Sequence, residues 1–332
     1  MDCVRELTLQ REDRFLSDRA QKCRDTKGRL VPEEEDDLRT AYQRDRDRIT
    51  HCNAFRRLQH KTQVFLSPFG DHYRTRLTHT LEVTQIARTL AVGLSLNEDL
   101  TEAIALGHDL GHTPFGHAGE RALDAVVPFG FHHYEQSLRV VDVIEKNGRG
   151  LNLTWEVRDG ILHHTRGEEA ATLEGRLVKH ADHIAYLNHD IDDAIRAGLF
   201  TEEELPAHFR EVLGKSKSAR INTLVLSTLE HTTGMDVCMA PAVEEAFAEL
   251  NEYMFDNVYT NPVCKGEEGK AVLVVQDLYH YFAAHPEEMP EDYRNIADRE
   301  SPERGACDYI SGMSDRYALK VYNDLFVPSP WA

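Results

Sequence analysis

The chain has 332 residues, with 41% hydrophobic and 29% charged side chains and a formal net charge of −19 at pH 7. This composition is typical of a globular protein that buries a sizeable core, and no apolar run approaches the roughly 20 residues that a membrane span requires. The acidic balance argues against a protein whose main task is to coat nucleic acid, because affinity for the phosphate backbone comes from a basic surface.

Residues 1–45 are rich in charge and poor in large apolar side chains, which predicts a charged arm or exposed helices. The segment lacks the basic start and apolar stretch of a secretory signal, so we expect a soluble, cytoplasmic protein. The six cysteines include no Cys-x-x-Cys pair, which predicts free structural thiols rather than a zinc knuckle or a redox motif.

Apolar residues recur at helical spacing through the rest of the chain, and no strand-like alternation competes with them. The pattern predicts an all-α fold, with a core over residues 46–200 and a helical C-terminal region over 201–332 packed on it. Glycine and proline interrupt the pattern between 111 and 116, which predicts a loop between helices, a natural place for catalytic groups. The predicted helices cover residues 77–97, 100–110, 118–127, 134–146, 154–163, 173–196, 221–229, 242–255 and 270–282.

Histidine is abundant, with 18 residues, and it is clustered between positions 108 and 133. The pair His108-Asp109 ends an apolar helical stripe, so an imidazole and a carboxylate leave the backbone at the same buried spot. His79 on the preceding helix and Asp182 on a later helix offer two more ligands. Together these residues predict one divalent ion per site, and imidazole with carboxylate suits Mn, Fe, Zn, Ni or Mg.

The sequence around these four positions carries a more specific signal. The pattern His79, His108-Asp109, Asp182 looks like the ligand signature of the HD-domain phosphohydrolases. Within that group the chain resembles the deoxyguanosinetriphosphate triphosphohydrolase family, strongly from about residue 46 to 196 and more weakly over 307–315. The segments that carry the resemblance are RTRLTHTLEV (74–83), GHDLGHTPFGH (107–117) and AYLNHDIDDA (185–194).

This resemblance implies an HD-domain helical fold with additional C-terminal helices, and a reaction. In that family a metal-bound water attacks the α-phosphorus of a deoxynucleoside triphosphate and releases the deoxynucleoside and inorganic triphosphate. The substrate implied here is dGTP, with other dNTPs open. A divalent ion lowers the pKa of its bound water from 15.7 towards about 7, which makes such an attack feasible. The resemblance also implies a homo-oligomer, for which a hexamer is one option, and it is compatible with a nucleotide activator.

The catalytic candidates follow the metal motif along the chain. His117 is the preferred proton donor to the leaving 5′-oxygen, and Glu120 lies three residues on, placed to fix its tautomer or hold it charged. The alternative for Glu120 is a carboxylate that stabilises a helix start. His112 in the loop can reach a phosphate oxygen, and His133 matches a further active-site histidine of the family. The donor stays open among these three histidines.

Four further residues are substrate-binding candidates. The resemblance implies that Arg76 pairs with the triphosphate, with a helix-stabilising salt bridge as the alternative. Tyr186 and Asp190 are four apart on one predicted helix and could bond the 3′-hydroxyl. Gln63 corresponds to a family position near the deoxyribose, where it helps to reject a ribose.

Two other functions remain open at this point. An HD enzyme could act on another phosphoester, such as a nucleoside monophosphate, or the protein could be a nucleotide sensor or a regulator that binds single-stranded nucleic acid. The acidic balance does not support nucleic-acid binding, and no membrane partner is expected. In an acidic protein, a phosphorylated substrate needs a local cluster of basic side chains to bind to. The alternative is that such side chains form surface salt bridges. The sequence offers Arg56, Arg57, Lys61, Arg74 and Arg76.

Overall fold

The structure is a computed structural model that describes residues 3–63, 74–165, 167–259 and 267–328. Within these ranges the secondary structure is helical, and β-pairing is limited to isolated bridges such as the one between Thr62 and Thr75. The predicted all-α class is therefore confirmed. Among the described helices, none combines the length and apolar character needed to cross a membrane.

The chain forms two compact units, each assembled from three separate segments. Unit 1 consists of Met1–Ile49, His79–His108 and Asn152–Pro262, and unit 2 of Thr50–Thr78, Asp109–Leu151 and Val263–Ala332. The peptide bond between His108 and Asp109 is thus one of the points where the chain passes from one unit to the other. The three consecutive regions expected from the sequence, residues 1–45, 46–200 and 201–332, stay a prediction.

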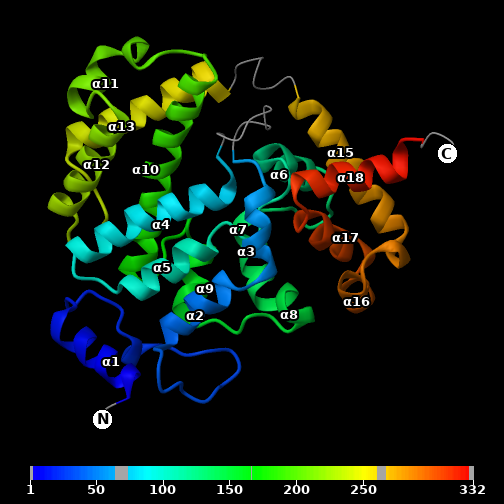
Figure 1. Cartoon of the computed structure of the whole chain (residues 1–332), viewed down its shortest axis with the longest axis horizontal. Coiled ribbons are helices and arrows are strands. Elements are labelled where there is room, and N and C mark those ends of the chain that lie inside the picture. The colour runs from blue at the N-terminus through cyan, green and yellow to red at the C-terminus, as the bar shows by residue number, and fades with distance from the viewer. Residues whose placement is uncertain (1–2, 64–73, 166, 260–266, 329–332) are drawn as a thin grey trace. The chain divides into compact units, whose positions relative to one another are not determined.

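Unit 1 is built around the long helix α10 (Leu173–Arg196), shown in green in Figure 1. It packs against α5 (Glu98–Gly107), α9 (Trp155–Leu162) and α12 (Lys217–His231). Apolar residues recur on α10 at spacings of three and four, which gives it a continuous buried face. The other elements that lie wholly or mainly in unit 1 are α1 (Val4–Phe15), η1 (Cys23–Asp25), α2 (Ala41–Thr50), α4 (Arg76–Gly93), η4 (Glu202–Glu204), α11 (Ala207–Val212), α13 (Pro241–Met254) and the π-helical η5 (Phe255–Tyr259).

Side-chain caps fix where the helices of unit 1 begin. The Asn97 side chain accepts the Leu100 N–H at the start of α5, and Thr172 accepts the Gly175 N–H at the start of α10. At the other end of α5, Gly107 permits close packing, because a Cβ there would lie 2.6 Å from a side-chain carbon of Ile161. These contacts place the residue after α5, His108, in the interior of the unit.

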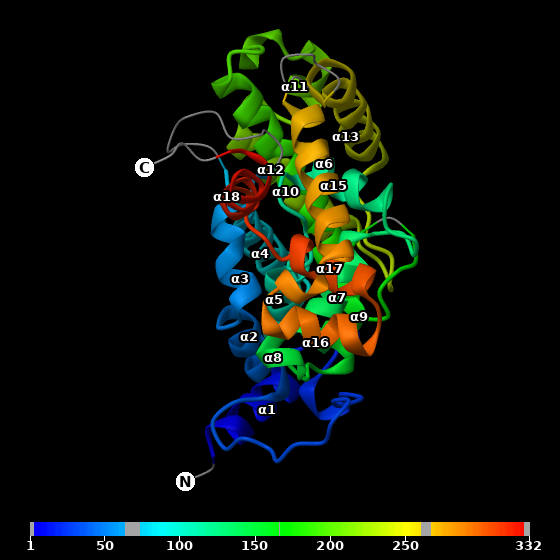
Figure 2. The ribbon, with the colours of Figure 1, turned by 90° about the vertical axis from the view of Figure 1, so that its right-hand side faces the viewer.

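Unit 2 has its own apolar core around α15 (Glu268–Ala284). This helix packs against α6 (Gly116–Asp124), α17 (Pro302–Ser311) and α18 (Asp315–Phe326), and Figure 2 shows α15 and α17 side by side. The core includes Phe115, Leu123, Phe131, Leu278, Phe282 and Ile310. The remaining elements are α3 (Asn53–Arg57), η2 (Leu58–His60), α7 (His133–Arg139), the π-helical η3 (Val140–Ile144), α8 (Glu145–Gly148), η6 (Pro286–Glu288) and α16 (Glu291–Arg299).

The single helix predicted over 134–146 is interrupted. After α7 the chain makes the π-helical turn η3, and Lys146 and Asn147 then have φ values of 54° and 58°, outside the helical region. The buried Glu145 carboxylate accepts the backbone N–H groups of Asn53 at 3.1 Å and Ala54 at 2.8 Å. Since Glu145 caps α3 in this way, tertiary contacts override the local helical pattern.

Gly111→Ala is expected to destabilise unit 2. A Cβ at Gly111 would lie 2.1 Å from the backbone N of Ser137 and 2.4 Å from the carbonyl carbon of Gln136. Backbone atoms of α7 cannot move aside as a flexible side chain can. We therefore expect the free energy of unfolding to fall by about 3 kcal/mol, the upper end of the range for overpacking. The urea midpoint measures this loss. Gly269→Ala is the control, because nothing lies within 4 Å of its Cβ position, and equal midpoints for the two variants would contradict the packing argument.

Candidate active site

Three of the four predicted metal ligands lie together in unit 1. His79 Nε2 is 3.0 Å from Asp182 Oδ1, and His108 Nε2 is 3.9 Å from the same oxygen. The two buried histidines also offer ligand nitrogens within 4.8 Å of each other. Since metal–ligand bonds of roughly 2.0–2.2 Å place two ligands of one ion about 3 to 4 Å apart, this spacing fits a single divalent ion.

The backbone orients His108 for such a role. Its Nδ1 lies 2.7 Å from the carbonyl oxygen of Ala105. A carbonyl can only accept, so Nδ1 carries the hydrogen and Nε2 presents its lone pair. Metal-binding histidines commonly donate their second N–H to a carbonyl or carboxylate in this manner. Two imidazole nitrogens and a carboxylate therefore form a donor set that fits the predicted ion.

Asp109 follows His108 by one peptide bond and belongs to unit 2. Its Oδ2 accepts a hydrogen bond from Arg76 Nη1 at 2.7 Å, and its Oδ1 lies 3.4 Å from His112 Nε2. Arg76 is buried and forms a salt bridge, but with Asp109, 33 positions away, rather than with a neighbour on its own helix. Its predicted contact with the triphosphate stays a prediction.

In unit 2 the structure brings together the four predicted catalytic residues, with Glu120 between two of the histidines. One carboxylate oxygen of Glu120 lies 3.2 Å from His117 Nδ1, and the other lies 2.8 Å from His133 Nδ1 and accepts the His133 backbone N–H at 2.9 Å. The His112 ring stacks on His133, with centroids 4.0 Å apart and planes 15° apart. Glu120 is therefore a bridge between two histidines rather than only a helix-start carboxylate.

The pKa values of Glu120 and His112 are both shifted, for different reasons. Burial opposes ionisation of Glu120, but hydrogen bonds from His117 and His133 outweigh it and hold the pKa of Glu120 well below its ordinary value. Burial, together with nearby Arg76 and His133, lowers the pKa of His112 well below its usual value. The His117 side chain is 64% exposed. An ionised carboxylate thus orients an accessible imidazole, His117, beside a buried neutral one, His112.

The same cluster is poorly suited to a second metal ion. Asp109, His112 and His133 offer ligand atoms within 4.8 Å of one another. The rings of His112 and His133 are nearly parallel, however, and an imidazole binds a metal along a lone pair in its own plane, at about 2.0–2.1 Å. Stacked rings do not direct those lone pairs at one point, so we assign no second ion here.

Tyr186 and Asp190 lie one turn apart on α10, and both contact later residues of unit 1. The Tyr186 hydroxyl donates to Asn251 Oδ1, and the Tyr259 hydroxyl donates to Asp190 Oδ2. The rings of Tyr186 and Tyr259 stack with centroids 6.5 Å apart. Burial, with Asp190 and Tyr186 nearby, raises the pKa of Tyr259 well above its usual value, so its phenol stays protonated and able to donate.

The remaining substrate-binding candidate, Gln63, lies next to Arg76 in unit 2. Its backbone oxygen accepts from Arg76 Nη2 at 3.4 Å, and a Cβ at Gly116 would lie 3.1 Å from the same oxygen. The side-chain oxygen of Gln63 is buried and has no hydrogen-bond partner among the described residues. That oxygen remains able to accept a hydrogen bond from a ligand.

Two buried histidines, which the sequence motifs did not single out, lie next to the predicted metal ligands in unit 1. The His164 ring lies 5.0 Å from that of His108, and the His189 ring lies 6.0 Å from that of His79. His189 is seven residues after Asp182 on α10, two turns along the same face, and this spacing could have revealed it. No comparable local signal points to His164, whose position depends on how α9 packs.

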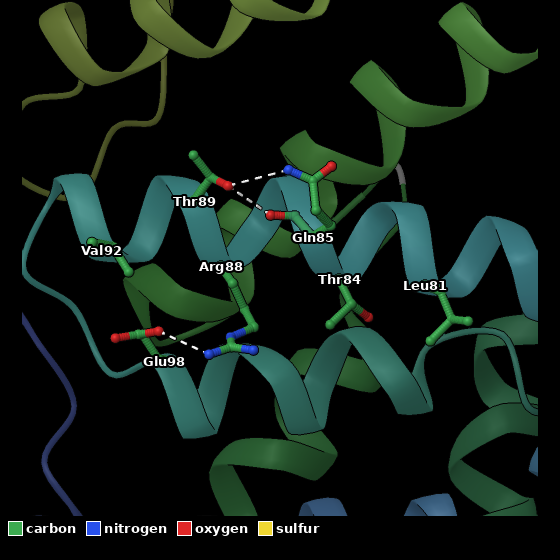
Figure 3. Close-up of a pocket in the computed structure, with 7 residues that line it drawn as sticks. All are labelled: Leu81, Thr84, Gln85, Arg88, Thr89, Val92 and Glu98. Atoms are coloured by element: carbon green, nitrogen blue, oxygen red, sulfur yellow. Dashed lines mark hydrogen bonds and ion pairs between the residues drawn. The ribbon is translucent and has the colours of Figure 1, made fainter.

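Figure 3 shows a surface hollow of about 540 Å³ over α4 in unit 1. Gln85 donates to Thr89, one turn further along α4, at 3.4 Å, and Arg88 pairs with Glu98 at 3.1 Å. None of the predicted site residues lines it, and its charged groups already pair with each other. We therefore place the candidate active site at the histidine and carboxylate clusters. The hollow is lined by Leu81, Thr84, Gln85, Arg88, Thr89, Val92 and Glu98.

The described part of the chain is helical, and it contains histidine and aspartate groups that could hold a metal ion. The HD domain model matches residues 76–187, which include all four predicted metal ligands. The model of the phosphohydrolase-associated domain matches residues 237–324. These matches define the protein as an HD-domain phosphohydrolase.

Three curated relatives, each named deoxyguanosinetriphosphate triphosphohydrolase-like protein, narrow the class further. The chain is 53% identical to the relative from Caldanaerobacter subterraneus subsp. tengcongensis, over 99% of this chain and 97% of that protein. It is 50% identical to the relative from Clostridium tetani, over 92% of this chain and 91% of that protein. It is 48% identical to the relative from Desulfatibacillum aliphaticivorans, over 98% of this chain and 99% of that protein. The chain therefore belongs to the family of deoxyguanosinetriphosphate triphosphohydrolase-like proteins, as the sequence motifs indicated.

Proposed function

We propose that this protein hydrolyses deoxynucleoside triphosphates, dGTP among them, to the deoxynucleoside and inorganic triphosphate. The observation that carries the proposal is the convergence of His79 and His108 on Asp182 at metal-ligand spacing in unit 1. Asp109, joined directly to His108, is the proposed fourth ligand. The relatives are named deoxyguanosinetriphosphate triphosphohydrolase-like proteins, which supports this substrate class.

The proposed ligand set would hold one divalent ion, which supplies a water of lowered pKa and screens phosphate charge. The four side chains would also define where the α-phosphate lies. Arg76 keeps Asp109 oriented through its 2.7 Å contact and adds positive charge beside the site. We propose that this charge faces the triphosphate, where a guanidinium can bind two phosphate oxygens at once.

The leaving 5′-oxygen needs a proton, and His117 is the proposed donor. Its Nδ1 lies 3.2 Å from the ionised Glu120 carboxylate, which orients the ring. The exposure of the ring leaves Nε2 accessible to substrate. His112, held neutral by burial, is assigned to a phosphate oxygen, and His133 supports it by stacking.

The sugar is assigned to the cluster on α10 and to Gln63. Asp190 accepts from the protonated Tyr259 and is proposed to accept from the 3′-hydroxyl as well, beside the Tyr186 ring. The buried side-chain oxygen of Gln63 is the proposed contact that limits space at C2′. A site built on buried polar groups discriminates strongly against a substrate that leaves them unpaired.

Asp190→Asn is expected to lower kcat/KM for dGTP by about tenfold or more, because a hydrogen bond to a charged group contributes roughly 1.5–3 kcal/mol. Metal content should be unchanged, since Asp190 is not among the proposed ligands. Steady-state kinetics with dGTP and with 3′-deoxy-dGTP measure the effect. If the sugar assignment holds, the variant discriminates less between the two nucleotides, and Asp192→Asn on the same helix behaves as wild type. Unchanged discrimination would contradict the assignment.

The reaction is tested by incubating the purified protein with Mn²⁺ or Mg²⁺ and each of the four dNTPs, followed by phosphate analysis. We expect equal amounts of deoxynucleoside and inorganic triphosphate. Orthophosphate from nucleoside monophosphates, without triphosphate release, would favour another HD phosphoesterase. Nucleotide binding with no product under any metal would favour a sensor. The predicted homo-oligomer and nucleotide activator stay predictions, which light scattering and kinetics with added nucleotides test.

A further inference from the structure

The histidine loop, residues 111–117, has an unusual backbone at its C-terminal end. Phe115 has φ 63° and ψ 24°, in the left-handed region that non-glycine residues rarely adopt, and Gly116 follows with φ 58°. Such a conformation persists only where the surroundings impose it. Because His112 and His117 flank this turn, whatever holds Phe115 also sets the positions of both imidazoles.

Asp315, the first residue of α18, makes the contact that holds the turn. Its Oδ1 accepts the Phe115 N–H at 2.9 Å. Its Oδ2 accepts both the backbone N–H of Thr62, at 2.9 Å, and the Thr62 hydroxyl. One carboxylate from the C-terminal helices therefore joins the strained turn to the segment that carries Gln63.

Lys61 makes a second connection at the other end of the loop. Its side chain is buried, and Nζ donates to the carbonyl oxygens of His112 and, at 2.8 Å, of Ser311. Ser311 is the last residue of α17, where the helix leaves carbonyl groups without internal partners. Burial lowers the pKa of Lys61 well below its usual value, with Arg57 and Arg76 adding to the effect. A buried amine that donates to two backbone carbonyls is costly to retain, which points to a specific role.

Helix α17 also holds α7, the helix that begins with His133. Gln136 Nε2 donates to Asp308 Oδ1 at 2.9 Å and to Ser311 Oγ at 3.0 Å. Arg139 Nε donates to the same Asp308 carboxylate at 2.8 Å. Asp308 is fully buried. The C-terminal helices of unit 2 thus contact the supports of all three candidate histidines.

We propose that Asp315 and Lys61 are positioning residues that hold the histidine loop in its active conformation, so that α17 and α18 take part in the chemistry of the site. The proposal rests on the proposed triphosphohydrolase function for its kinetic consequences. Neither residue is assigned a contact with substrate. Both act through the backbone of the loop, Asp315 at Phe115 and Lys61 at His112.

The test compares Asp315→Ala, Asp315→Asn and wild type by steady-state kinetics. Alanine removes both acceptor oxygens, whereas asparagine keeps one. We expect kcat for triphosphate release to fall about tenfold to a hundredfold in Asp315→Ala, the range that small misplacements of catalytic groups produce. Metal content should change less than about threefold, because Asp315 is bonded to Phe115 and Thr62 and to none of the proposed ligands. KM should change less than kcat, because Asp315 has no proposed contact with substrate. Asp315→Asn should recover part of the loss.

Hydrogen–deuterium exchange gives a readout that does not depend on turnover. Peptides that cover residues 111–119 should exchange faster in Asp315→Ala, with peptides from α15 unchanged. Asp324→Asn is the matched control, because Asp324 lies on the same helix, is exposed and pairs with Lys320 one turn away. This control should match wild type in both kinetics and exchange.

The outcomes distinguish a failure of the positioning role from a failure of the proposed triphosphohydrolase function. Faster exchange of the loop with unchanged kcat would mean that Asp315 holds the loop but does not affect catalysis, which would contradict the positioning role. Unchanged exchange would mean that Asp315 does not hold the loop. If Asp315→Ala does not fold, Thr62→Val, which removes only the hydroxyl donor, must show the same pattern with a smaller kcat loss. If wild type releases no triphosphate, the proposed function fails and the catalytic part of this proposal fails with it, while exchange still reports whether Asp315 restrains the loop.

Discussion

Asp109→Ala is expected to abolish both metal content and turnover. The substitution removes the proposed fourth ligand and also leaves the buried Arg76 guanidinium without its 2.7 Å carboxylate partner. Breaking a buried ion pair from one side costs about 3–5 kcal/mol, so the thermal midpoint should fall as well. Metal analysis by mass spectrometry, after dialysis against the free ion, gives the stoichiometry, and triphosphate release gives the activity.

The control separates loss of the ligand from loss of the fold. Asp109→Asn keeps the shape of the side chain and one acceptor oxygen for Arg76, so it should melt closer to wild type while still binding metal poorly. Normal metal stoichiometry in a folded Asp109→Ala protein would reject Asp109 as a ligand. The cluster of His79, His108 and Asp182 in unit 1 would then have to hold the ion without it.

His117→Ala is expected to keep its metal ion and to lose turnover by a factor of about 10² to 10⁴, the usual range for a general acid. The ring is largely exposed and contacts Glu120, so its removal should cost little stability. Steady-state kinetics with dGTP measure the loss. His132→Ala is the matched control, since His132 is an exposed histidine close by in the sequence and should turn over normally. Full activity in His117→Ala would move the donor to His112 or His133.

The parts of the fold that the sequence predicted well are those set by local periodicity. The helix predicted over 173–196 is observed as Leu173–Arg196, because its apolar face repeats without interruption and Thr172 caps its start. The break between α5 and α6 was also predictable, since glycine and proline interrupt the apolar stripe there. The prediction of one helix over 134–146 was wrong at its C-terminal end, because Glu145 binds the first N–H groups of α3. No local pattern reveals that contact.

The candidate site shows the same division between local and tertiary information. The contact between His117 and Glu120 follows from their spacing on one helix turn, and the structure contains it. The second contact of Glu120, with His133, depends on how α6 and α7 pack. Tyr259 lies 69 positions from Asp190, in a π-helical turn that carries no recognisable motif. Its place beside Tyr186 could come only from the tertiary structure.

The predicted basic cluster shows why charge counts alone do not identify a phosphate site. Arg57 lies 3.8 Å from Glu145, and Arg76 binds Asp109. Lys61 binds two backbone carbonyls. These three side chains therefore have partners within the protein, and two of those partners are carboxylates. The alternative of surface salt bridges does not describe Arg76, which is buried. Arg76 is bonded to one of the proposed metal ligands, Asp109.

The fate of the oxygen from water tests the central claim most directly. When dGTP is hydrolysed in H₂¹⁸O with the divalent ion present, attack at the α-phosphorus places one ¹⁸O in inorganic triphosphate and leaves deoxyguanosine unlabelled. We predict this distribution, and we predict that chelation of the ion stops its formation. Label in deoxyguanosine, or in orthophosphate alone, would mean that a different bond breaks and would contradict the account.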